Sequence, residues 1–394
     1  MLYFLYFAIF AFFLSSYMFI PFFALYVREL GGSYVEFAMA LSVTGFLLSI
    51  IQSYIGYLSD KIGSGFLVIS GGIISALGFL FIGITYNKIL IFPLYLIMNV
   101  GTGILTPSVF SLISYQRTVK GNSFIPIYRS IQGAGVIIGP ILGGRIMKYS
   151  YRINVILGSL LMLFSTIFFL AYFLKQDSKN FSYIQKSENN INFKQAIIDV
   201  IYNRSFMIVA LLFILVELSY DLVRLGVPII SAELNFGTDI TGTALSAYFI
   251  IFTLFQIPVN NILRKMNRRT ALVLMGILSL FTYSLLLFEG PAYAVIFIMG
   301  GVGLTIGSLF TFCSVLAAET SPDGKKGTFM GVFNTILPFT DVISPILVVF
   351  FMNINIKFPY VAATILILVF IILSIFFYTS VENVKVEKCS EKID

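Results

Sequence analysis

Long apolar blocks, separated by short polar turns, follow one another along nearly the whole chain. Each block holds about 20 residues or slightly more, which is the length that a helix needs to cross about 30 Å of hydrocarbon. Glycine, proline and charged residues mark the turns, as at Gly31-Gly32-Ser33, Asn87-Lys88 and Gly290-Pro291. The pattern predicts twelve membrane-spanning helices, at residues 3–27, 35–58, 66–86, 89–114, 124–147, 152–174, 205–230, 240–263, 270–288, 291–317, 328–352 and 358–379.

One polar stretch is much longer than the turns, and it divides the predicted helices into two sets of six. The halves share short sequences: Pro140-Ile-Leu returns as Pro345-Ile-Leu, at an offset of 345 − 140 = 205, and both halves hold a G-x4-S-x-F pattern. Two pseudo-symmetric six-helix bundles are the plan of many alternating-access transporters. We therefore predict an all-α membrane protein with a bundle at 1–174, a cytoplasmic linker at 175–204, a bundle at 205–380 and a cytoplasmic tail at 381–394.

Composition supports a membrane location. Hydrophobic residues make up 58% of the chain and charged residues 11%, whereas soluble proteins average roughly 45–50% and 25%. Lys and Arg gather in the linker, the tail and alternate loops, as expected if both termini face the cytoplasm of a multi-pass protein in the plasma membrane. The net charge of +7 is therefore explained by basic residues on the cytoplasmic side of the membrane. We expect a lipid bilayer as partner, and no nucleic acid.

Two features that the sequence lacks limit the reactions and energy sources that we expect. The chain has no His, so proton transfer near neutral pH falls to carboxylates. The sequence contains no G-x4-G-K-[ST] loop for ATP. We expect no enzymatic activity, no metal and no other cofactor, and an ion gradient as the source of energy for a monomeric transporter.

A glycine-rich run stands in the fifth predicted span. It reads G-x3-G-P-x2-G-G, and interior Gly and Pro cost a helix about 1 and 3 kcal/mol relative to Ala. In a bilayer, Gly allows two helix backbones to approach closely, and neighbouring helices can bond to the carbonyl that Pro leaves free. The run predicts a kinked, tightly packed helix, and its residues are Gly135, Gly139, Pro140, Gly143 and Gly144.

The loop between the second and third spans has a recognisable sequence, in which Gly56, Asp60, Lys61 and Gly63 spell G-x3-D-K-x-G. Together with twelve spans, it resembles the signature loop of the major facilitator superfamily, G-x3-D-[RK]-x-G. The resemblance implies the major facilitator fold and a gating latch at Asp60 and Lys61, although Ser64-Gly65 replaces the usual basic pair. An ordinary polar turn is the alternative.

The glycine-rich run resembles the motif of the antiporters, the efflux branch of that family, and generic helix packing is its alternative. Another efflux pattern, R-x2-Q-G-x-G, belongs on the fourth helix of such proteins; here Arg129, Gln132 and Gly135 spell it on the fifth, which we interpret as coincidence. Arg129 lies about five residues, or ~8 Å, inside the span. It either faces water, a partner or substrate, or extends to the membrane surface.

The seventh span carries the sharpest pattern, because Glu217, Asp221 and Arg224 follow at i, i+4 and i+7 and share one helix face. Glu217 lies near the membrane midplane, where ionisable residues usually serve function. The alternative is a structural network in which Arg224 holds both acids. Tyr220 adjoins this face, and Asp341 in the eleventh span is a further proton carrier or a partner for Arg129 or Arg224.

These residues predict a secondary transporter in which a small-molecule substrate and protons share a site between the bundles. The leading hypothesis is proton-coupled export of an amphipathic or cationic molecule by alternating access. Proton-coupled uptake of a nutrient, such as a sugar or an organic acid, is the alternative within the class. A membrane sensor that keeps the fold without transport is the alternative outside it.

Overall fold

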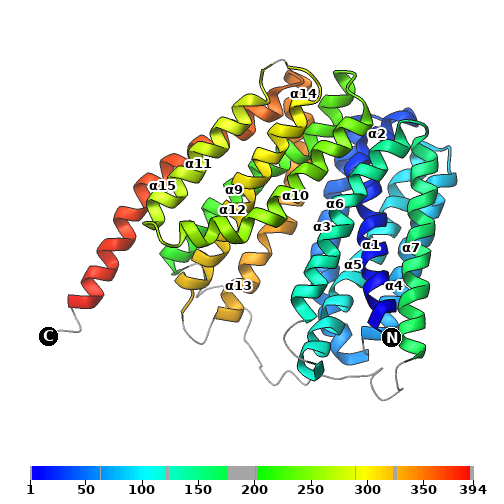
Figure 1. Cartoon of the computed structure of the whole chain (residues 1–394), viewed down its shortest axis with the longest axis horizontal. Helices are drawn as coiled ribbons and strands as arrows, with labels where there is room; N and C mark the ends of the chain where they lie inside the picture. Colours follow the sequence, from blue (N-terminus) through cyan, green and yellow to red (C-terminus); the bar gives the residue numbers. More distant parts are fainter. Residues whose placement is uncertain are drawn as a thin grey trace. The chain divides into compact units, whose positions relative to one another are not determined.

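The computed structural model describes residues 2–62, 64–120, 124–175, 200, 202–288, 290–322 and 326–390. The described part is helical and contains no strand (Figure 1). Its helices are α1 (Leu2–Phe19), η1 (Ile20–Phe22), α2 (Phe23–Glu29), α3 (Tyr34–Ile62), α4 (Ser64–Ile84), α5 (Lys88–Lys120), α6 (Phe124–Met147), α7 (Tyr151–Leu174), α9 (Arg204–Glu233), α10 (Thr238–Leu263), α11 (Arg268–Leu285), α12 (Ala294–Thr320), α13 (Lys326–Asn334), α14 (Ile336–Ile354) and α15 (Phe358–Ser390).

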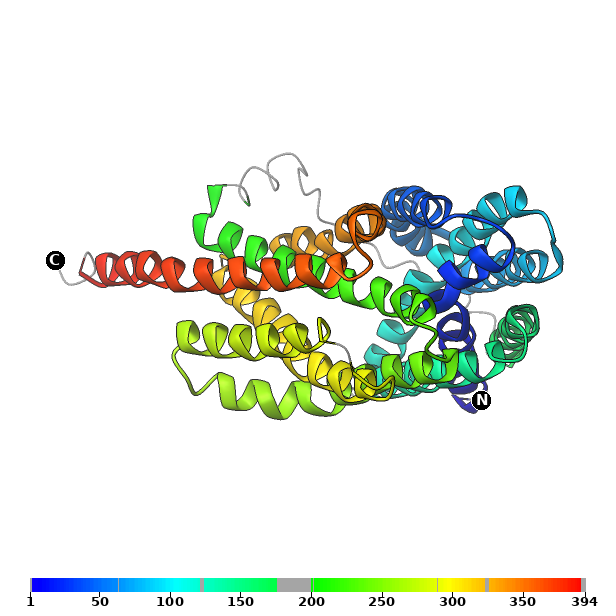
Figure 2. The same ribbon diagram turned by 90° about the horizontal axis from the view of Figure 1, so that it is seen from above.

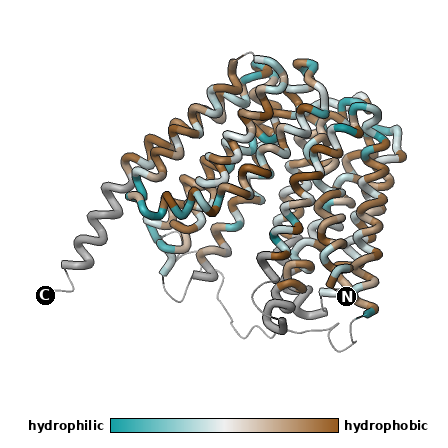
Figure 3. Tube along the Cα trace, in the orientation of Figure 1, coloured by the Kyte–Doolittle hydropathy of each residue, from teal (hydrophilic) through white to brown (hydrophobic). Residues whose placement is uncertain are grey.

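Ten helices in the described residues are long and apolar enough to cross a membrane. Figure 3 shows hydrophobic residues along the length of these helices and hydrophilic ones concentrated near their ends. Bulky apolar side chains such as Phe297 and Leu254 are exposed within the spans, as expected for surfaces that contact lipid. The fold class predicted from the apolar blocks, an all-α multi-pass membrane protein, is confirmed.

Two predicted spans are interrupted at proline. The first consists of α1, the short 3-10 helix η1 and α2, with Pro21 in η1. The eleventh consists of α13 and α14, which meet at Thr335. Pro338 lacks the N–H that a continuous helix would bond to the Asn334 carbonyl, so the α-helix stops and restarts there.

The described chain divides into two compact units, and each is described by itself. Unit 1 contains Met1–Glu188, Val227–Ser246 and Asp341–Val349, and unit 2 contains the remainder. Within unit 1, α1 packs along α6 and α7, and α4 packs along α5 and α7. Within unit 2, α11 packs against α12 and α15 (Figures 1 and 2). The boundaries of the two six-helix bundles stay a prediction.

Buried polar side chains join α1 to α7 through the backbone. Ser15 Oγ donates to the Gly158 carbonyl at 2.6 Å, and Ser165 Oγ donates to the Ala8 carbonyl at 2.8 Å. Asn154 Nδ2 donates to the Met18 carbonyl at 2.9 Å. In an apolar solvent, such bonds and close packing hold helices together in place of the hydrophobic effect.

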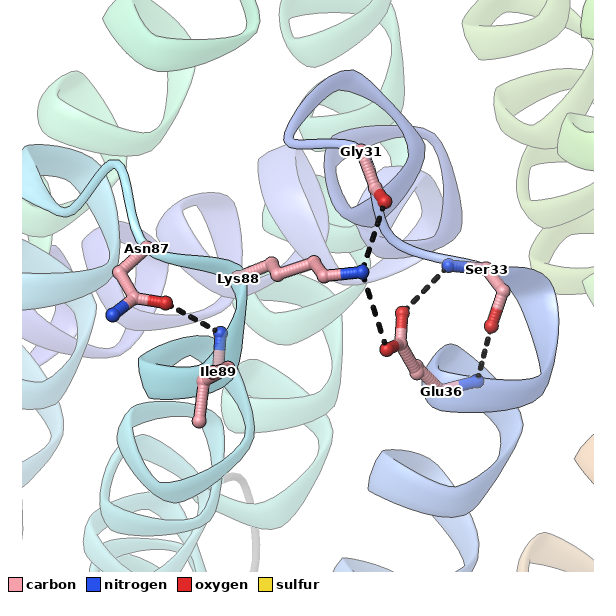
Figure 4. Close-up of polar contacts among 6 residues, drawn as sticks. All are labelled: Gly31, Ser33, Glu36, Asn87, Lys88 and Ile89. Carbon is pink, nitrogen blue, oxygen red and sulfur yellow. Dashed lines mark hydrogen bonds and ion pairs between the residues drawn. The ribbon is translucent and has the colours of Figure 1, made fainter.

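The turns that join α2 to α3 and α4 to α5 are tied to each other (Figure 4). Gly31 adopts φ 76°, a conformation that favours glycine. The Ser33 N–H donates to Glu36 Oε2 at 2.7 Å, while the Glu36 N–H donates to Ser33 Oγ at 3.2 Å, which is a reciprocal helix cap. Lys88 Nζ reaches the Gly31 carbonyl at 3.4 Å and Glu36 Oε1 at 3.7 Å. These contacts fix where α3 and α5 begin.

Candidate functional site

The middle of α9 carries two buried acids. Glu217 lies 217 − 204 = 13 residues from the start of α9 and 233 − 217 = 16 residues from its end. Glu217 is 5% exposed and Asp221 is 3% exposed. Carboxylates at such a depth are costly in a bilayer, and they usually mark a functional path.

Asp221 pairs with Arg224 on the same helix. Arg224 Nη2 lies 2.7 Å from Asp221 Oδ1, and Arg224 Nε donates to the same oxygen at 3.0 Å. The Arg224 side chain is 29% exposed, and its guanidinium carbon lies 5.8 Å from the centre of the Tyr220 ring. One turn of helix thus combines an ion pair with an aromatic face.

Aromatic residues from neighbouring helices of unit 2 surround these acids. Tyr220 of α9 and Tyr248 of α10 stack with ring centres 4.8 Å apart and an interplanar angle of 18°. The Tyr283 hydroxyl of α11 lies 3.4 Å from Ser219 Oγ. We name Glu217, Tyr220, Asp221, Arg224 and Tyr248 the α9 cluster.

Sequence reasoning found Tyr220 but missed Tyr248 and Tyr283. The chain holds 22 tyrosines, and most tyrosines in a membrane protein contact lipid or the interface. The position of a tyrosine within an apolar segment therefore does not tell whether its side chain faces lipid or the buried acids. The i, i+4, i+7 pattern of charges on α9 could be identified because charged residues inside spans are rare.

The other candidate residues lie in unit 1. Arg129 Nη1 donates to Gln132 Oε1 at 3.0 Å, and its guanidinium lies 5.9 Å from the Phe110 ring centre and 5.7 Å from that of Tyr128. Asp341 lies on α14 where α3 approaches closely: a Cβ on Gly45 would stand 3.6 Å from the Asp341 carbonyl carbon. Unit 1 thus brings Arg129 and Gln132 together.

The loop with the G-x3-D-K-x-G sequence is covered only in part. Gly56, Asp60 and Lys61 lie in α3, which ends at Ile62. The side chains of Asp60 and Lys61 are not among the described ones, and Gly63 lies outside the described residues. The latch at this loop stays a prediction from the sequence.

The glycine-rich run of α6 lies directly on the backbone of α1. Gly135, Gly139 and Gly143 follow at intervals of four and share one face. A Cβ on Gly135 would stand 2.9 Å from the Leu14 nitrogen, one on Gly139 2.7 Å from Tyr17 Cβ, and one on Gly143 would collide with the Met18 carbonyl oxygen. Any larger residue on this face therefore requires the two helices to separate.

A second face of the same run meets the start of α10, also within unit 1. A Cβ on Gly144 would collide with the Thr238 carbonyl, and one on Gly242 with the Pro140 carbonyl. Ser246 Oγ donates to the carbonyl of Ile137, three residues before Pro140, at 2.6 Å. Thr238 Oγ1 donates to the Gly144 carbonyl at 2.8 Å, so α10 supplies hydrogen bonds around the proline.

An ion pair and a charged cluster continue these contacts at the helix ends. Lys148 Nζ lies 3.0 Å from Asp239 Oδ2. Glu233, at the end of α9, accepts from the Tyr34 hydroxyl at 2.8 Å and lies 3.7 Å from Arg28. The pairs lie beside the end of α6 and the start of α3, and they join the segments of unit 1 that are distant in sequence.

Spanning-length apolar helices around buried carboxylates define a multi-pass membrane protein of the transporter class. A profile of the Major Facilitator Superfamily matches residues 5–223 and 209–392. The chain belongs to this superfamily, and the family predicted from the loop at Gly56–Gly63 and the glycine-rich run is confirmed. Members of this superfamily are membrane transporters.

Relatives with assigned functions match over part of their length. The multi-drug resistance efflux pump PmrA homolog of Lactococcus lactis is 30% identical over 161 residues, 39% of this chain and 40% of that pump. The proton-coupled antiporter flippase LtaA of Staphylococcus saprophyticus is 27% identical over 158 residues, again 39% of this chain and 40% of that protein. Each alignment thus spans about two fifths of the relative.

Other similarities cover the whole fold. An uncharacterized MFS-type transporter of Methanocaldococcus jannaschii is 23% identical over 84% of this chain and 82% of its own length. The nucleoside transporter NupG superposes with a TM-score of 0.77 at 14% identity, over 95% of this chain and 98% of that one. A POT family transporter gives a TM-score of 0.72 at 14% identity, over 96% of each chain. These superpositions establish the major facilitator fold.

Proposed function

We propose that this transporter exports a small amphipathic or cationic molecule in exchange for protons, by alternating access. The α9 cluster is the observation that carries the proposal, because it combines buried acids, a guanidinium and stacked aromatic rings at mid-helix. The names of two relatives, a multi-drug resistance efflux pump and a proton-coupled antiporter flippase, favour the same assignment.

Proton coupling in this proposal depends on competition for two carboxylates. Burial favours the neutral form of a carboxylate, whereas a guanidinium within about 4–6 Å favours the ionised form. A cationic substrate that pairs with Glu217 or Asp221 takes the place of a proton, and protonation releases the substrate. If helix movement changes which acid Arg224 contacts, proton affinity changes with it, and no further group is needed for exchange.

The stacked pair of Tyr220 and Tyr248 fits the substrate class. Aromatic faces attract cations, and tyrosine combines an apolar ring with a polar hydroxyl. A flat organic cation would therefore find charge and ring surface in one place. We also propose Arg129, Gln132 and Asp341, which lie in unit 1, as substrate- or proton-binding residues.

The remaining parts of the proposal concern orientation and gating. We propose that the chain lies in the plasma membrane with both termini in the cytoplasm, and that it works as a monomer. We also propose that Asp60 and Lys61 form a cytoplasmic latch that closes and opens with each cycle. An exposed Asp–Lys pair is worth only about 0–1 kcal/mol in water, so such a latch adjusts rates and leaves substrate affinity unchanged.

Cellular accumulation tests the direction of transport. Expression of the chain in cells is expected to lower the accumulation of ethidium, a planar aromatic cation, compared with cells that express Glu217→Gln at the same level. Accumulation that rises with expression would contradict export and support uptake.

Asp60→Asn is expected to slow transport several-fold while leaving substrate affinity unchanged, because it weakens a contact that forms during cycling. The initial rate of ethidium movement in proteoliposomes and the Kd from equilibrium binding check this. Glu29→Gln is the matched control, since it removes an exposed acid at the end of α2. An unchanged rate with weaker binding would refute the latch.

A further inference from the structure

A groove lined by aromatic and aliphatic side chains runs along α1 where it adjoins α6 and α7. Five of its lining residues come from α1 between Tyr3 and Phe10, two come from α6, Ile131 and Ala134, and Phe168 comes from α7. Its volume is about 490 Å³, within the roughly 300–1,000 Å³ that is typical of ligand pockets. The whole groove belongs to unit 1, and it contains none of the charged residues proposed to carry transport.

The groove extends along the first part of α1, over a length that fits within one leaflet. Tyr3 and Phe10 lie 10 − 3 = 7 residues apart on α1, which is about 11 Å of helical rise. A single leaflet contributes about 15 Å of hydrocarbon. Tyr3 is 85% exposed and Phe7 47% exposed, so the groove opens outward along a membrane-spanning helix. Its length, about 11 Å along α1, matches part of one lipid acyl chain.

Phenylalanine rings in tilted contact form the wall of the groove nearest its charged end. The Phe168 ring centre lies 4.6 Å from that of Phe7 and 5.8 Å from that of Phe4. Lys175, which directly follows the last residue of α7, places Nζ 4.5 Å from the centre of the Phe4 ring. Among the described residues, no carboxylate forms an ion pair with Lys175. An apolar groove thus ends beneath a cation at the membrane boundary.

We propose that this groove binds an anionic phospholipid, with one acyl chain along α1 and the phosphate on Lys175. An acyl chain suits a lining without charged groups, and a phosphate would give Lys175 an anionic partner, which it does not have among the described residues. A lysine near a membrane surface attracts anionic lipid by about 1 kcal/mol, or about fivefold in affinity. The site serves lipid whatever the transported substrate is.

The absence of Trp from the chain allows a direct test. Phe168→Trp introduces a single fluorescent reporter into the groove, and Leu274→Trp introduces one on the exposed face of α11. Both positions lie six residues from a helix end, 174 − 168 and 274 − 268, so their depths match at about 9 Å. Each protein is reconstituted in phosphatidylcholine vesicles that contain increasing fractions of phosphatidylglycerol with brominated chains, which quench tryptophan on contact.

We expect Phe168→Trp to be quenched at a several-fold lower fraction of brominated phosphatidylglycerol than Leu274→Trp. In the Phe168→Trp background, Lys175→Gln is expected to raise the required fraction about fivefold. Lys265→Gln, which removes an equal charge from an exposed loop, is expected to leave the required fraction of brominated phosphatidylglycerol unchanged. Ala134→Leu, which fills the groove from α6, is expected to reduce quenching, whereas Ala362→Leu on α15 does not.

Four results would overturn the proposal. Equal quenching curves for the two reporters would mean that the groove takes bulk lipid only. Equal quenching by brominated phosphatidylcholine, or no effect of Lys175→Gln, would remove the role of the anionic headgroup. Displacement of the brominated lipid by ethidium would assign the groove to the transported cation. None of these readouts requires transport, so failure here is distinguishable from failure of the proposed export.

Discussion

Glu217→Gln and Asp221→Asn, tested singly, are expected to abolish proton-driven transport while exchange of substrate without a gradient continues. The reason is that each removes a carboxylate that is almost fully buried at mid-helix. With no His in the chain, few other groups could load and release protons near neutral pH. Ethidium movement in proteoliposomes, with an imposed pH gradient and then at equal pH with labelled and unlabelled ethidium, separates the two activities.

Folding has to be separated from coupling in the Asp221 variant. Removing one member of a buried ion pair typically costs about 3–5 kcal/mol, and Asp221→Asn removes the partner of Arg224. The double variant Asp221→Asn with Arg224→Gln removes both charges of this ion pair, so it is expected to recover yield and melting temperature without recovering proton-driven transport. Full driven transport in both single variants would contradict the proposal and move the proton site to Asp341.

Gly143→Ala is expected to destabilise the protein strongly, because its Cβ would collide with the Met18 carbonyl oxygen of α1. Neither backbone can yield without separating the helices, and overpacking of this kind typically costs about 1–3 kcal/mol. The melting temperature and yield of the purified protein in detergent check this. Gly139→Leu, which would meet Tyr17, is expected to impair folding or transport rate and to leave the choice of substrate unchanged.

Gly300→Ala is the matched control for this prediction. Gly300 also lies inside a helix, but its nearest neighbour would stand 3.6 Å from an added Cβ, an ordinary contact. The exchange is expected to be neutral or to stabilise by up to about 1 kcal/mol, through helix propensity. Equal effects of Gly143→Ala and Gly300→Ala, or a Gly139→Leu variant with normal yield and rate but altered substrate preference, would contradict the packing role.

The spans were predictable from the sequence because a bilayer imposes a minimum apolar length on every crossing helix. Breaks within a span were not. Residues 328–352 were predicted as one helix, and the α-helix is interrupted at Thr335, before Pro338. Proline can kink a membrane helix or end it, depending on which neighbours bond to the freed carbonyl, and the sequence does not record those neighbours.

The candidate site could be predicted where it contains residue types that are rare in membrane spans and that recur at helical spacing. Glu217, Asp221 and Arg224 could be placed on one face by counting, as could the three glycines at 135, 139 and 143. The partner of each face depends on tertiary packing. No spacing rule assigns Tyr248 to Tyr220, Met18 to Gly143 or Ser246 to the Ile137 carbonyl.

Coupled movement of protons and a cation in opposite directions is the central claim, and the internal pH of proteoliposomes tests it most directly. Vesicles with an acidic interior and a clamped membrane potential receive ethidium from outside. The proposal predicts that ethidium accumulates while the interior becomes more alkaline, and that protein with both Glu217→Gln and Asp221→Asn shows neither change. Ethidium entry without a change in internal pH, or movement of ethidium and protons in the same direction, would contradict it.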